Sequence, residues 1–223
     1  MDSYQQIFDR AADYHGGAAA LKALLPKPVS AKKLKAIPDD RWLAHMTKCV
    51  FRAGFSWKVI ENKWPNFEIA FDGFDPHKNA MKSDDDLSQL LKDKGIVRNW
   101  EKIKSVRSNA IFVTELAKEH GSAAAFFADW PADDMVGLWE VLKKRGSRLG
   151  GTSGSYFLRG MERDTFIFSP DVVKALIGQG IIDKPPTSKT AQRAVQHAFN
   201  TWRAESGRSL SEISRTLSCS VGP

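Results

Sequence analysis

The stretch that decides the fold runs from Leu142 to Gly160 and reads LKKRGSRLGGTSGSYFLRG. Two helical patterns meet here at a turn rich in glycine, serine and threonine, and the first pattern ends in the basic run Lys143–Arg145 and stops at Gly146. A turn with so few side chains can bring backbone N–H groups close to a phosphate, because a Cβ would obstruct the approach and glycine accepts a positive φ. The alternative is a plain glycine turn between two helices.

The sequence on both sides of this turn is also patterned as helices. A capping box at Ser83–Asp86 begins one helix, and apolar residues at three- and four-residue steps over Ile103–Ala117 predict a longer one. Similar steps over Ala191–Trp202 predict a third helix, and SLSE at Ser209–Glu212 predicts a capped final helix. The segment DTFIF at 164–168 is the clearest strand-like alternation, and it is short. We therefore expect an all-α fold.

A chain of 223 residues suits one domain or two closely packed lobes. We expect a single domain over 1–223, with the helix-hairpin-helix at 139–160 and a C-terminal helical extension at 187–223. Leu24–Ile37 carries two prolines and four lysines and predicts a loop. Further helices are expected after Pro131, with two aspartates in the first turn, and after Asp171 as N-cap.

Composition limits the partners and the compartment. There are 33 Lys and Arg against 26 Asp and Glu, a net charge of +7, which favours polyanionic partners such as nucleic acid, although many enzymes are equally basic. Two cysteines, Cys49 and Cys219, fit a reducing compartment better than a disulfide framework. The start is polar and acidic, unlike a signal peptide, and no apolar run approaches the ~20 residues of a membrane helix. We expect a cytoplasmic monomer that does not enter membranes.

The histidines are scattered along the chain, with no pair at helical ligand spacing and no CxxC. We therefore expect no metal site and no cofactor. The five are His15, His45, His77, His120 and His197.

Several motifs occur in an order that points to one family. FRAGFSWKVI (51–60), FDGFDPHKNAM (71–81), LLKDKGIVRNWEKIKSVRSNA (90–110) and LKKRGSRLGGTS (142–153) resemble successive segments of the 3-methyladenine DNA glycosylase I family. DYHGG at 13–17 is a fainter N-terminal match. The whole 142–160 stretch resembles the helix-hairpin-helix of the wider DNA glycosylase superfamily.

The resemblance implies a helix-hairpin-helix DNA glycosylase-like bilobal helical fold and a role in base excision repair. The implied reaction is hydrolysis of the N-glycosidic bond of an alkylated purine such as 3-methyladenine, after the nucleotide has flipped out of double-stranded DNA. One alternative is a non-catalytic DNA-binding protein that keeps the same fold. A third possibility is a basic helical protein that binds another partner and never contacts DNA.

The implied base pocket departs from the family at one position. Counting back from Trp57, Cys49 stands where the family carries a pocket glutamate, and a thiol does not match a carboxylate as a hydrogen-bond acceptor. Trp57 matches the pocket tryptophan, and Tyr14 is a second stacking candidate from the N-terminal match. Core packing is the alternative for both aromatic residues. His15 matches one zinc ligand of the family, but no cysteine lies near the expected partners.

The superfamily has an aspartate after the second helix of the hairpin, and here that position is Asp164 in ERDTFIF. By resemblance it is the catalytic residue, which stabilises the positive charge that develops on the sugar or orients a water molecule. The alternative is a helix N-cap or a partner for Arg159 or Arg163.

Residues implied to contact DNA fall into two groups. Arg52 and Phe55 flank Gly54 in a loop that matches the family's DNA-penetrating loop, with an apolar wedge that offsets unstacking; the alternative is that Phe55 is buried beneath the loop. The second group surrounds the hairpin, which has no lysine at the place where bifunctional glycosylases carry a Schiff-base nucleophile, so no lyase activity is expected. Its members are Lys143, Lys144, Arg148, Gly150, Gly151, Thr152, Ser153 and Gly154.

Overall fold

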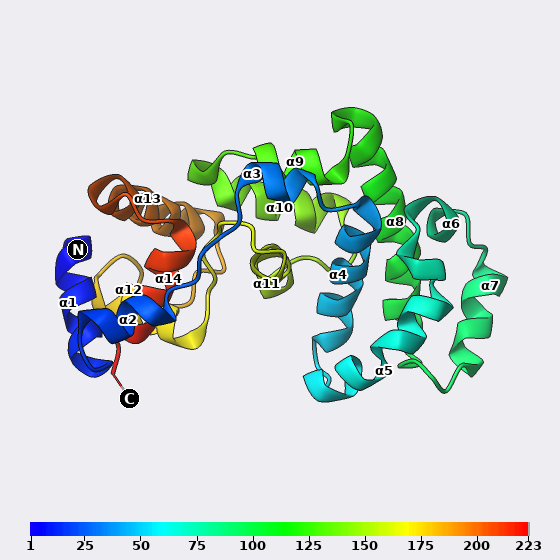
Figure 1. Cartoon of the computed structure of the whole chain (residues 1–223), viewed down its shortest axis with the longest axis horizontal. Coiled ribbons are helices and arrows are strands. Elements are labelled where there is room, and N and C mark those ends of the chain that lie inside the picture. The colour runs from blue at the N-terminus through cyan, green and yellow to red at the C-terminus, as the bar shows by residue number, and fades with distance from the viewer. Residues whose placement is uncertain (223) are drawn as a thin grey trace. The chain divides into compact units, whose positions relative to one another are not determined.

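The computed structural model describes residues 1–222, and within that range it contains helices and no strand (Figure 1), which confirms the all-α prediction. The α-helices are α1 Tyr4–Tyr14, α2 Ala18–Leu24, α3 Ala31–Lys35, α4 Asp39–Arg52, α5 Trp57–Ala70, α6 Pro76–Ala80, α7 Asp84–Gln89, α8 Trp100–His120, α9 Ala123–Asp129, α10 Met135–Arg145, α11 Thr152–Gly160, α12 Pro170–Gly178, α13 Lys189–Ser206 and α14 Leu210–Cys219. Short 3₁₀ turns lie at Asp72–Phe74, Leu90–Lys92 and Ala132–Asp134.

The chain divides into two compact units. Unit 1 contains both termini and consists of Met1–Val29, Pro131–Leu138 and Glu162–Pro223. Unit 2 consists of Ser30–Trp130 and Trp139–Met161. The domain expected over residues 1–223 therefore contains two units, and each has its own set of buried apolar side chains.

Aromatic side chains form the centre of unit 2. Trp42 of α4 is fully buried, stacks on Phe127 of α9 at 4.8 Å between ring centroids, and meets Phe157 of α11 edge-on at 5.8 Å. The buried positions of α4 recur at three- and four-residue steps, as in an amphipathic helix. Helix α8 packs along α4 and α6 with the face that carries Ile103 and Val106. These contacts hold α4 and α11 together at the position of the hairpin.

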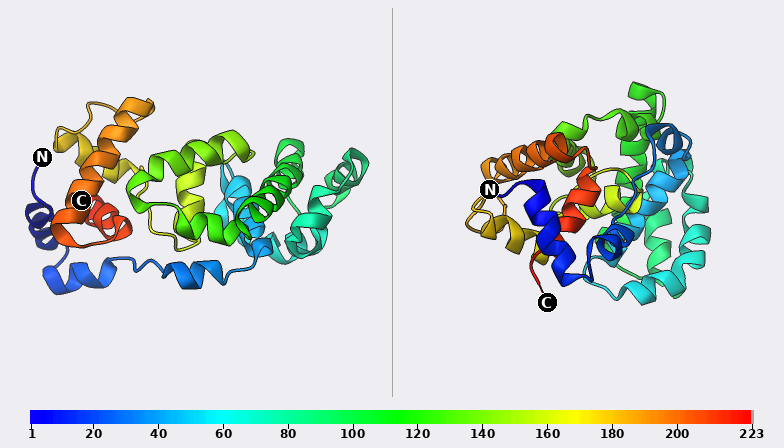
Figure 2. Two further views of the ribbon diagram at one scale, coloured as in Figure 1. Left: turned by 90° about the horizontal axis from the view of Figure 1, so that it is seen from above. Right: turned by 60° about the vertical axis from the view of Figure 1, so that its left-hand side comes forward.

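Unit 1 joins the two ends of the chain. Helices α1 and α14 lie side by side (Figure 2), and the Tyr4 hydroxyl is 3.2 Å from the hydroxyl of Thr216. The Trp202 indole N–H donates to the carbonyl of Asp2 at 3.0 Å, and Phe166 stacks on the ring of Phe199 at 4.2 Å. The segment predicted as a C-terminal extension is thus part of the core of unit 1.

Capping residues set most of the helix limits. The predicted capping boxes at Ser83 and Ser209 are both confirmed, with each serine accepting from the backbone N–H three residues later. The predicted hairpin is also confirmed, although its first helix α10 begins at Met135 rather than near residue 139.

Three predicted details are wrong. Residues Ala31–Lys35 within the expected loop form α3, because the Ser30 hydroxyl caps the Lys33 N–H and Leu34 is buried. The N-cap of α12 is Ser169 and not Asp171, which lies in the first turn. The aspartates after Pro131 belong to a 3₁₀ turn that precedes α10.

Candidate functional site

The hairpin connects α10 to α11 in unit 2. Helix α11 begins after Gly151, which has a φ of +60° and provides no side-chain cap to the first N–H groups of the helix. Arg148 in the turn also adopts a positive φ, +62°, and its side chain is exposed. An uncapped helix N-terminus carries partial positive charge, so it can bind an anion.

The hairpin glycines have different roles. A Cβ on Gly154 would lie 2.7 Å from the Leu149 carbonyl oxygen, so this glycine allows α11 to pack against its own turn. A Cβ on Gly151 would meet no atom within 4 Å, and the residue is exposed. Gly154 therefore serves the fold, whereas the backbone at Gly151 is open to a ligand.

A buried asparagine of α8 fixes the turn from behind. The side-chain amide of Asn109 donates to the carbonyl of Ser147 at 3.1 Å and its oxygen accepts from the N–H of Ser147 at 2.7 Å. Asn109 is fully buried. The sequence analysis did not identify this clamp, although a polar residue on the apolar face of the long helix was a visible signal.

Basic groups surround the open side of the hairpin. A cavity of about 350 Å³ is lined by Val50, Ala53, Arg148, Gly150 and Ser153. Lys143 and Lys144 on the last turn of α10 are exposed, whereas the third basic residue of that run is held in ion pairs with two glutamates of α8. The arrangement combines an uncapped helix N-terminus with exposed cations, which suits a phosphate group.

The loop after α4 contains the predicted wedge. Gly54 has a φ of +75°, and Phe55 follows it with 41% of its surface exposed. The alternative in which Phe55 is buried beneath the loop is therefore not what the structure contains. The cavity beside the hairpin includes Ala53, so the wedge loop and the hairpin meet within unit 2.

Trp57 begins α5 and leaves 57% of its surface exposed. Arg52 lies over its ring, with the guanidinium carbon 4.8 Å from the ring centroid. Arg52 also pairs with Glu61, one turn further along α5, and the ammonium of Lys48 pairs with the same carboxylate at 2.9 Å. The hydrogen bond from Lys48, followed by that from Arg52, lowers the pKa of Glu61 despite partial burial. A base could stack on the covered face of Trp57 only after Arg52 moves.

Cys49 lies on the same helix as Arg52 and is half-buried. Burial raises the pKa of its thiol to about 11, against the opposing effect of Arg52 and Lys48. The thiol is therefore neutral at physiological pH and is a poor nucleophile. It can contribute shape and weak hydrogen bonding to a pocket.

His45 lies one turn before Cys49 and was not assigned a role from the sequence. Burial, together with the charges of Arg52 and Lys48, lowers its pKa to about 4. Its Nε2 atom is buried and has no hydrogen-bond partner among residues 1–222. A Cβ on Gly160 would lie 2.1 Å from this nitrogen, so α4 and α11 pack closely at this point. In the sequence, the four-residue spacing between His45 and Cys49 was the sign that the two side chains lie on the same face of a helix.

Asp164 belongs to unit 1, where its carboxylate meets the start of α14. One oxygen accepts from the N–H of Leu210 at 3.1 Å and the other from the N–H of Ser211 at 2.8 Å. The Arg163 guanidinium donates to the backbone carbonyl of Asp164 at 2.8 Å. The helix-capping alternative from the sequence analysis is thus present, but on α14 and not on the helix that follows in sequence. The two N–H donors fix the orientation of the carboxylate.

Tyr14, the second stacking candidate, lies at the end of α1 in unit 1 with 53% of its surface exposed. A Cβ on Gly222 would be 3.3 Å from its ring, so the ring lies against the last described residue. Within a single unit, the structure therefore brings together the wedge loop, the Cys49–Trp57 region and the hairpin, while Tyr14 and Asp164 belong to the other unit.

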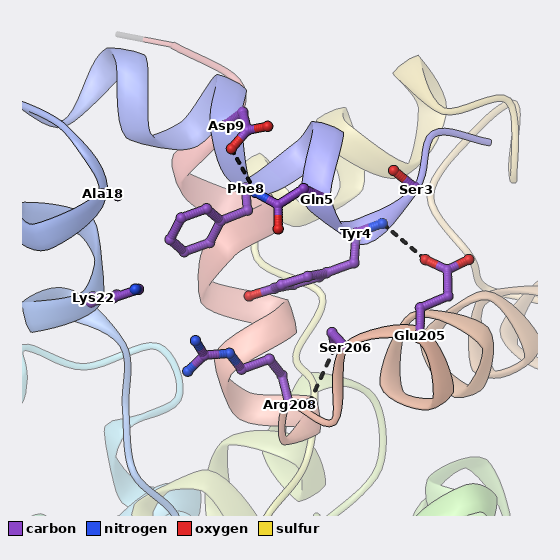
Figure 3. A pocket seen from close by; sticks show the side chains of 10 residues that line it. All are labelled: Ser3, Tyr4, Gln5, Phe8, Asp9, Ala18, Lys22, Glu205, Ser206 and Arg208. Carbon is purple, nitrogen blue, oxygen red and sulfur yellow. Dashed lines mark hydrogen bonds between the residues drawn. The ribbon is translucent and has the colours of Figure 1, made fainter.

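A second cavity, of about 590 Å³, lies in unit 1 between α1, α2 and the α13–α14 junction (Figure 3). Lys22 and Arg208 point into it, while Glu205 accepts from the N–H of Tyr4 at 3.0 Å. The two rings that line it, Tyr4 and Phe8, are buried. Its mixed charge and lack of an exposed ring make it a poor base pocket, and no residue predicted from the sequence lines it.

Residues 1–222 contain neither a metal-binding cluster nor a membrane-spanning helix. No group of three or more His, Cys, Asp or Glu side chains is placed to share a metal ion. None of the helices combines the length and the apolar character needed to cross a bilayer.

Comparison with known proteins places this geometry in a family. A model of the methyladenine glycosylase family matches residues 36–148, just over half of the chain. DNA-3-methyladenine glycosylase 1 of Escherichia coli strain K12 is 37% identical over 124 aligned residues, and the match covers 47% of this chain and 66% of that enzyme. The chain thus matches about two thirds of the length of this curated relative.

Solved structures share the fold. The structure of 3-methyladenine DNA glycosylase I from Staphylococcus aureus that describes its recognition of 3-methyladenine superposes with a TM-score of 0.52 at 20% identity, covering 62% of this chain and 80% of that one. The 8-oxoguanine DNA glycosylase of Methanocaldococcus jannaschii superposes with a TM-score of 0.57 at 13% identity, covering 94% and 91%. The expected helix-hairpin-helix DNA glycosylase fold is therefore confirmed. On the match over residues 36–148, the chain belongs to the methyladenine glycosylase family.

Proposed function

We propose that the protein is a monofunctional DNA glycosylase that removes methylated purines, such as 3-methyladenine, from double-stranded DNA. The observation that carries the proposal is the site in unit 2, where an uncapped helix N-terminus at Gly151 and an exposed Phe55 lie on segments of the family match or directly next to it. Binding of a DNA phosphate at the hairpin would hold the DNA backbone in place, while Phe55 fills the space left by the flipped nucleotide.

The hairpin supports a hydrolytic mechanism. Residues Gly146–Gly151 include an arginine and no lysine, so they provide no amine for a Schiff base. Water then attacks the sugar as the base departs. We assign Asp164 the electrostatic role: its carboxylate, oriented by two N–H donors of α14, stabilises the oxocarbenium-like sugar.

Cys49 and Trp57 form the proposed base pocket. Position 49 carries a neutral thiol, so the pocket has no negative charge there. Arg52 must also leave the ring of Trp57 before a base can stack on it. A methylated purine nucleotide is cationic and its base leaves readily, so modest stabilisation of the sugar suffices for release.

A second candidate function is DNA binding without catalysis. The observation in its favour is that both carboxylate oxygens of Asp164 already accept backbone hydrogen bonds, as in a structural cap. Such a protein would keep the hairpin and the wedge and would release no base.

Incubation with DNA methylated at purines distinguishes the two functions. We expect release of free 3-methyladenine with no strand cleavage by the protein itself, measured by chromatography of the soluble bases and by gel electrophoresis. Salt-dependent duplex binding without base release would support the second function and contradict the first. Neither binding nor release would rule out both.

A further inference from the structure

A lysine is buried beneath the wedge loop. Lys102 of α8 is 5% exposed, and its ammonium donates to the carbonyl of Phe51 at 3.2 Å and to the carbonyl of Ala53 at 2.5 Å. The same ammonium lies 4.4 Å from the ring centroid of Phe55. No acidic side chain among residues 1–222 forms an ion pair with Lys102. The charge is therefore balanced only by backbone dipoles and ring faces.

This arrangement is unfavourable for stability alone. Burying a charge costs free energy unless an opposite charge or good hydrogen bonds replace the water. Burial, with a smaller effect from the charge of Arg148, lowers the pKa of Lys102. An apolar side chain of the same length would fill the space without this cost. The position therefore points to a task that needs a cation.

The contacts of Lys102 indicate the task. Phe51 and Ala53 flank the end of α4, where the helix carbonyls carry partial negative charge, and Gly54 follows with its left-handed backbone. The ammonium thus binds the backbone before Gly54 and the ring after it. One ammonium group therefore contacts the chain on both sides of Gly54.

We propose that Lys102 is a positioning residue that presets Phe55 for insertion into DNA, an inference that rests on the proposed function. A wedge that is already ordered loses less conformational freedom when it enters the duplex. Lys102 does not contact DNA or the reacting atoms in this role, because it lies below the loop. It acts through Phe55 alone.

The test uses the full chain and a duplex that carries 2-aminopurine next to a stable abasic-site analogue, where unstacking raises the fluorescence. Lys102→Met is compared with Lys104→Met, a matched control on the same helix whose ammonium lies over Trp100 and pairs with Glu101. We expect Lys102→Met to reduce unstacking at equal bound protein about tenfold, as when a loop must be ordered during binding. Lys104→Met should leave it unchanged.

Two further variants separate positioning from general stability. In Phe55→Ala the wedge is absent, so adding Lys102→Met should cause no further loss of unstacking, whereas a merely structural role would add its own loss. Lys102→Arg keeps the cation and should restore most of the signal. If the methionine variant melts below the assay temperature, Lys102→Gln replaces it, with the same expected direction of change.

The outcomes distinguish this inference from the proposed function. Wild-type unstacking by Lys102→Met or Lys102→Gln overturns the inference, whatever the base-release activity. If the wild type releases no base from methylated DNA but loses its unstacking signal with Lys102→Met, the positioning role stands and the glycosylase function falls. If the wild type unstacks nothing, the inference is wrong.

Discussion

The N-termini of α11 and α14 illustrate two uses of the same backbone geometry. Helix α14 begins in unit 1 with Ser209 as cap and Glu212 completing a capping box, and Asp164 accepts the next two N–H groups. Helix α11 begins in unit 2 with Gly151, an exposed glycine that caps nothing. Each helix leaves its first N–H groups without internal acceptors, so the difference lies in what satisfies them.

The comparison separates binding from chemistry. The N-terminus of α11 has no carboxylate cap and has cations nearby, so an external phosphate can take the place of a cap. The N-terminus of α14 is satisfied internally, and two hydrogen bonds hold the carboxylate that satisfies it, that of Asp164, in one orientation.

Removing the negative charge of Asp164 at the N-terminus of α14 should have the largest effect on base release. Asp164→Asn keeps an oxygen for one N–H group but removes the negative charge, and we expect base release from methylated DNA to fall about a hundredfold in single-turnover assays. Duplex affinity, measured in parallel, should stay the same. The substitution should also cost about 1 kcal/mol of unfolding free energy through the weakened cap.

Ser209→Ala is the matched control for that variant. It weakens the same helix end by removing the capping hydroxyl and leaves the charge of Asp164 in place. Its base release should match the wild type at a temperature where both are folded. Equal losses of base release in the two variants would show that Asp164 is a structural cap and that another residue carries out the chemistry.

Two hairpin glycines test the other helix end. Gly154→Ala places a Cβ against the Leu149 carbonyl, so its unfolding free energy should fall by about 1–3 kcal/mol in urea titrations. In Gly151→Val the Cβ meets no neighbour, but the residue must adopt a positive φ, which should cost about 1–2 kcal/mol. Only Gly151→Val should reduce the duplex affinity of the folded protein at moderate salt. Unchanged affinity would mean that the open backbone at Gly151 does not contact phosphate.

Local signals were sufficient to predict much of this site. The capping boxes at Ser83 and Ser209 each join residues three positions apart, and the hairpin lies within one continuous stretch of sequence, so local patterns predict them. Gly151 and Gly154 were both expected at the phosphate contact, but only the structure separates an open backbone from a packed one. That separation depends on Leu149, whose carbonyl turns toward α11.

Contacts distant in sequence could not be predicted in the same way. Asn109 clamps Ser147 from 38 positions earlier, and Glu61 holds Arg52 from another helix. Asp164 was assigned to chemistry or to capping on sequence grounds, yet its partners lie 46 and 47 residues later at α14. The packing of α14 in unit 1 creates this contact, and no spacing rule encodes it.

Substitution of Cys49, the neutral thiol of the proposed pocket, should have a smaller effect on base release. Cys49→Glu places a carboxylate beside Lys48 and Arg52, where it can accept a hydrogen bond from a methylated adenine. We expect release of 3-methyladenine to rise about tenfold, the effect of one charge-assisted hydrogen bond. Cys49→Ser changes the polarity without adding charge and should leave the rate within about twofold of the wild type. A glutamate variant no faster than the serine variant would show that the pocket needs no carboxylate here.

The C-terminal end of α11, where Gly160 packs against His45, gives the smallest expected effect. The quantity measured there is the free energy of unfolding and not the rate of base release. Because burial lowers the pKa of His45 to about 4, the unfolded chain binds a proton below about pH 6.5 that the folded chain rejects. This loss of stability is absent well above pH 6.5 and grows as the pH falls toward 4. Between pH 7.5 and pH 6.0 it amounts to about 0.8 kcal/mol, a range in which ordinary carboxylates stay charged. Urea titrations of the wild type and of His45→Phe at the two pH values measure it, and only the wild type should lose this increment. Equal pH dependence in both proteins would mean that His45 is protonated when folded, and that α4 and α11 pack less tightly beside Gly160 than the structure indicates.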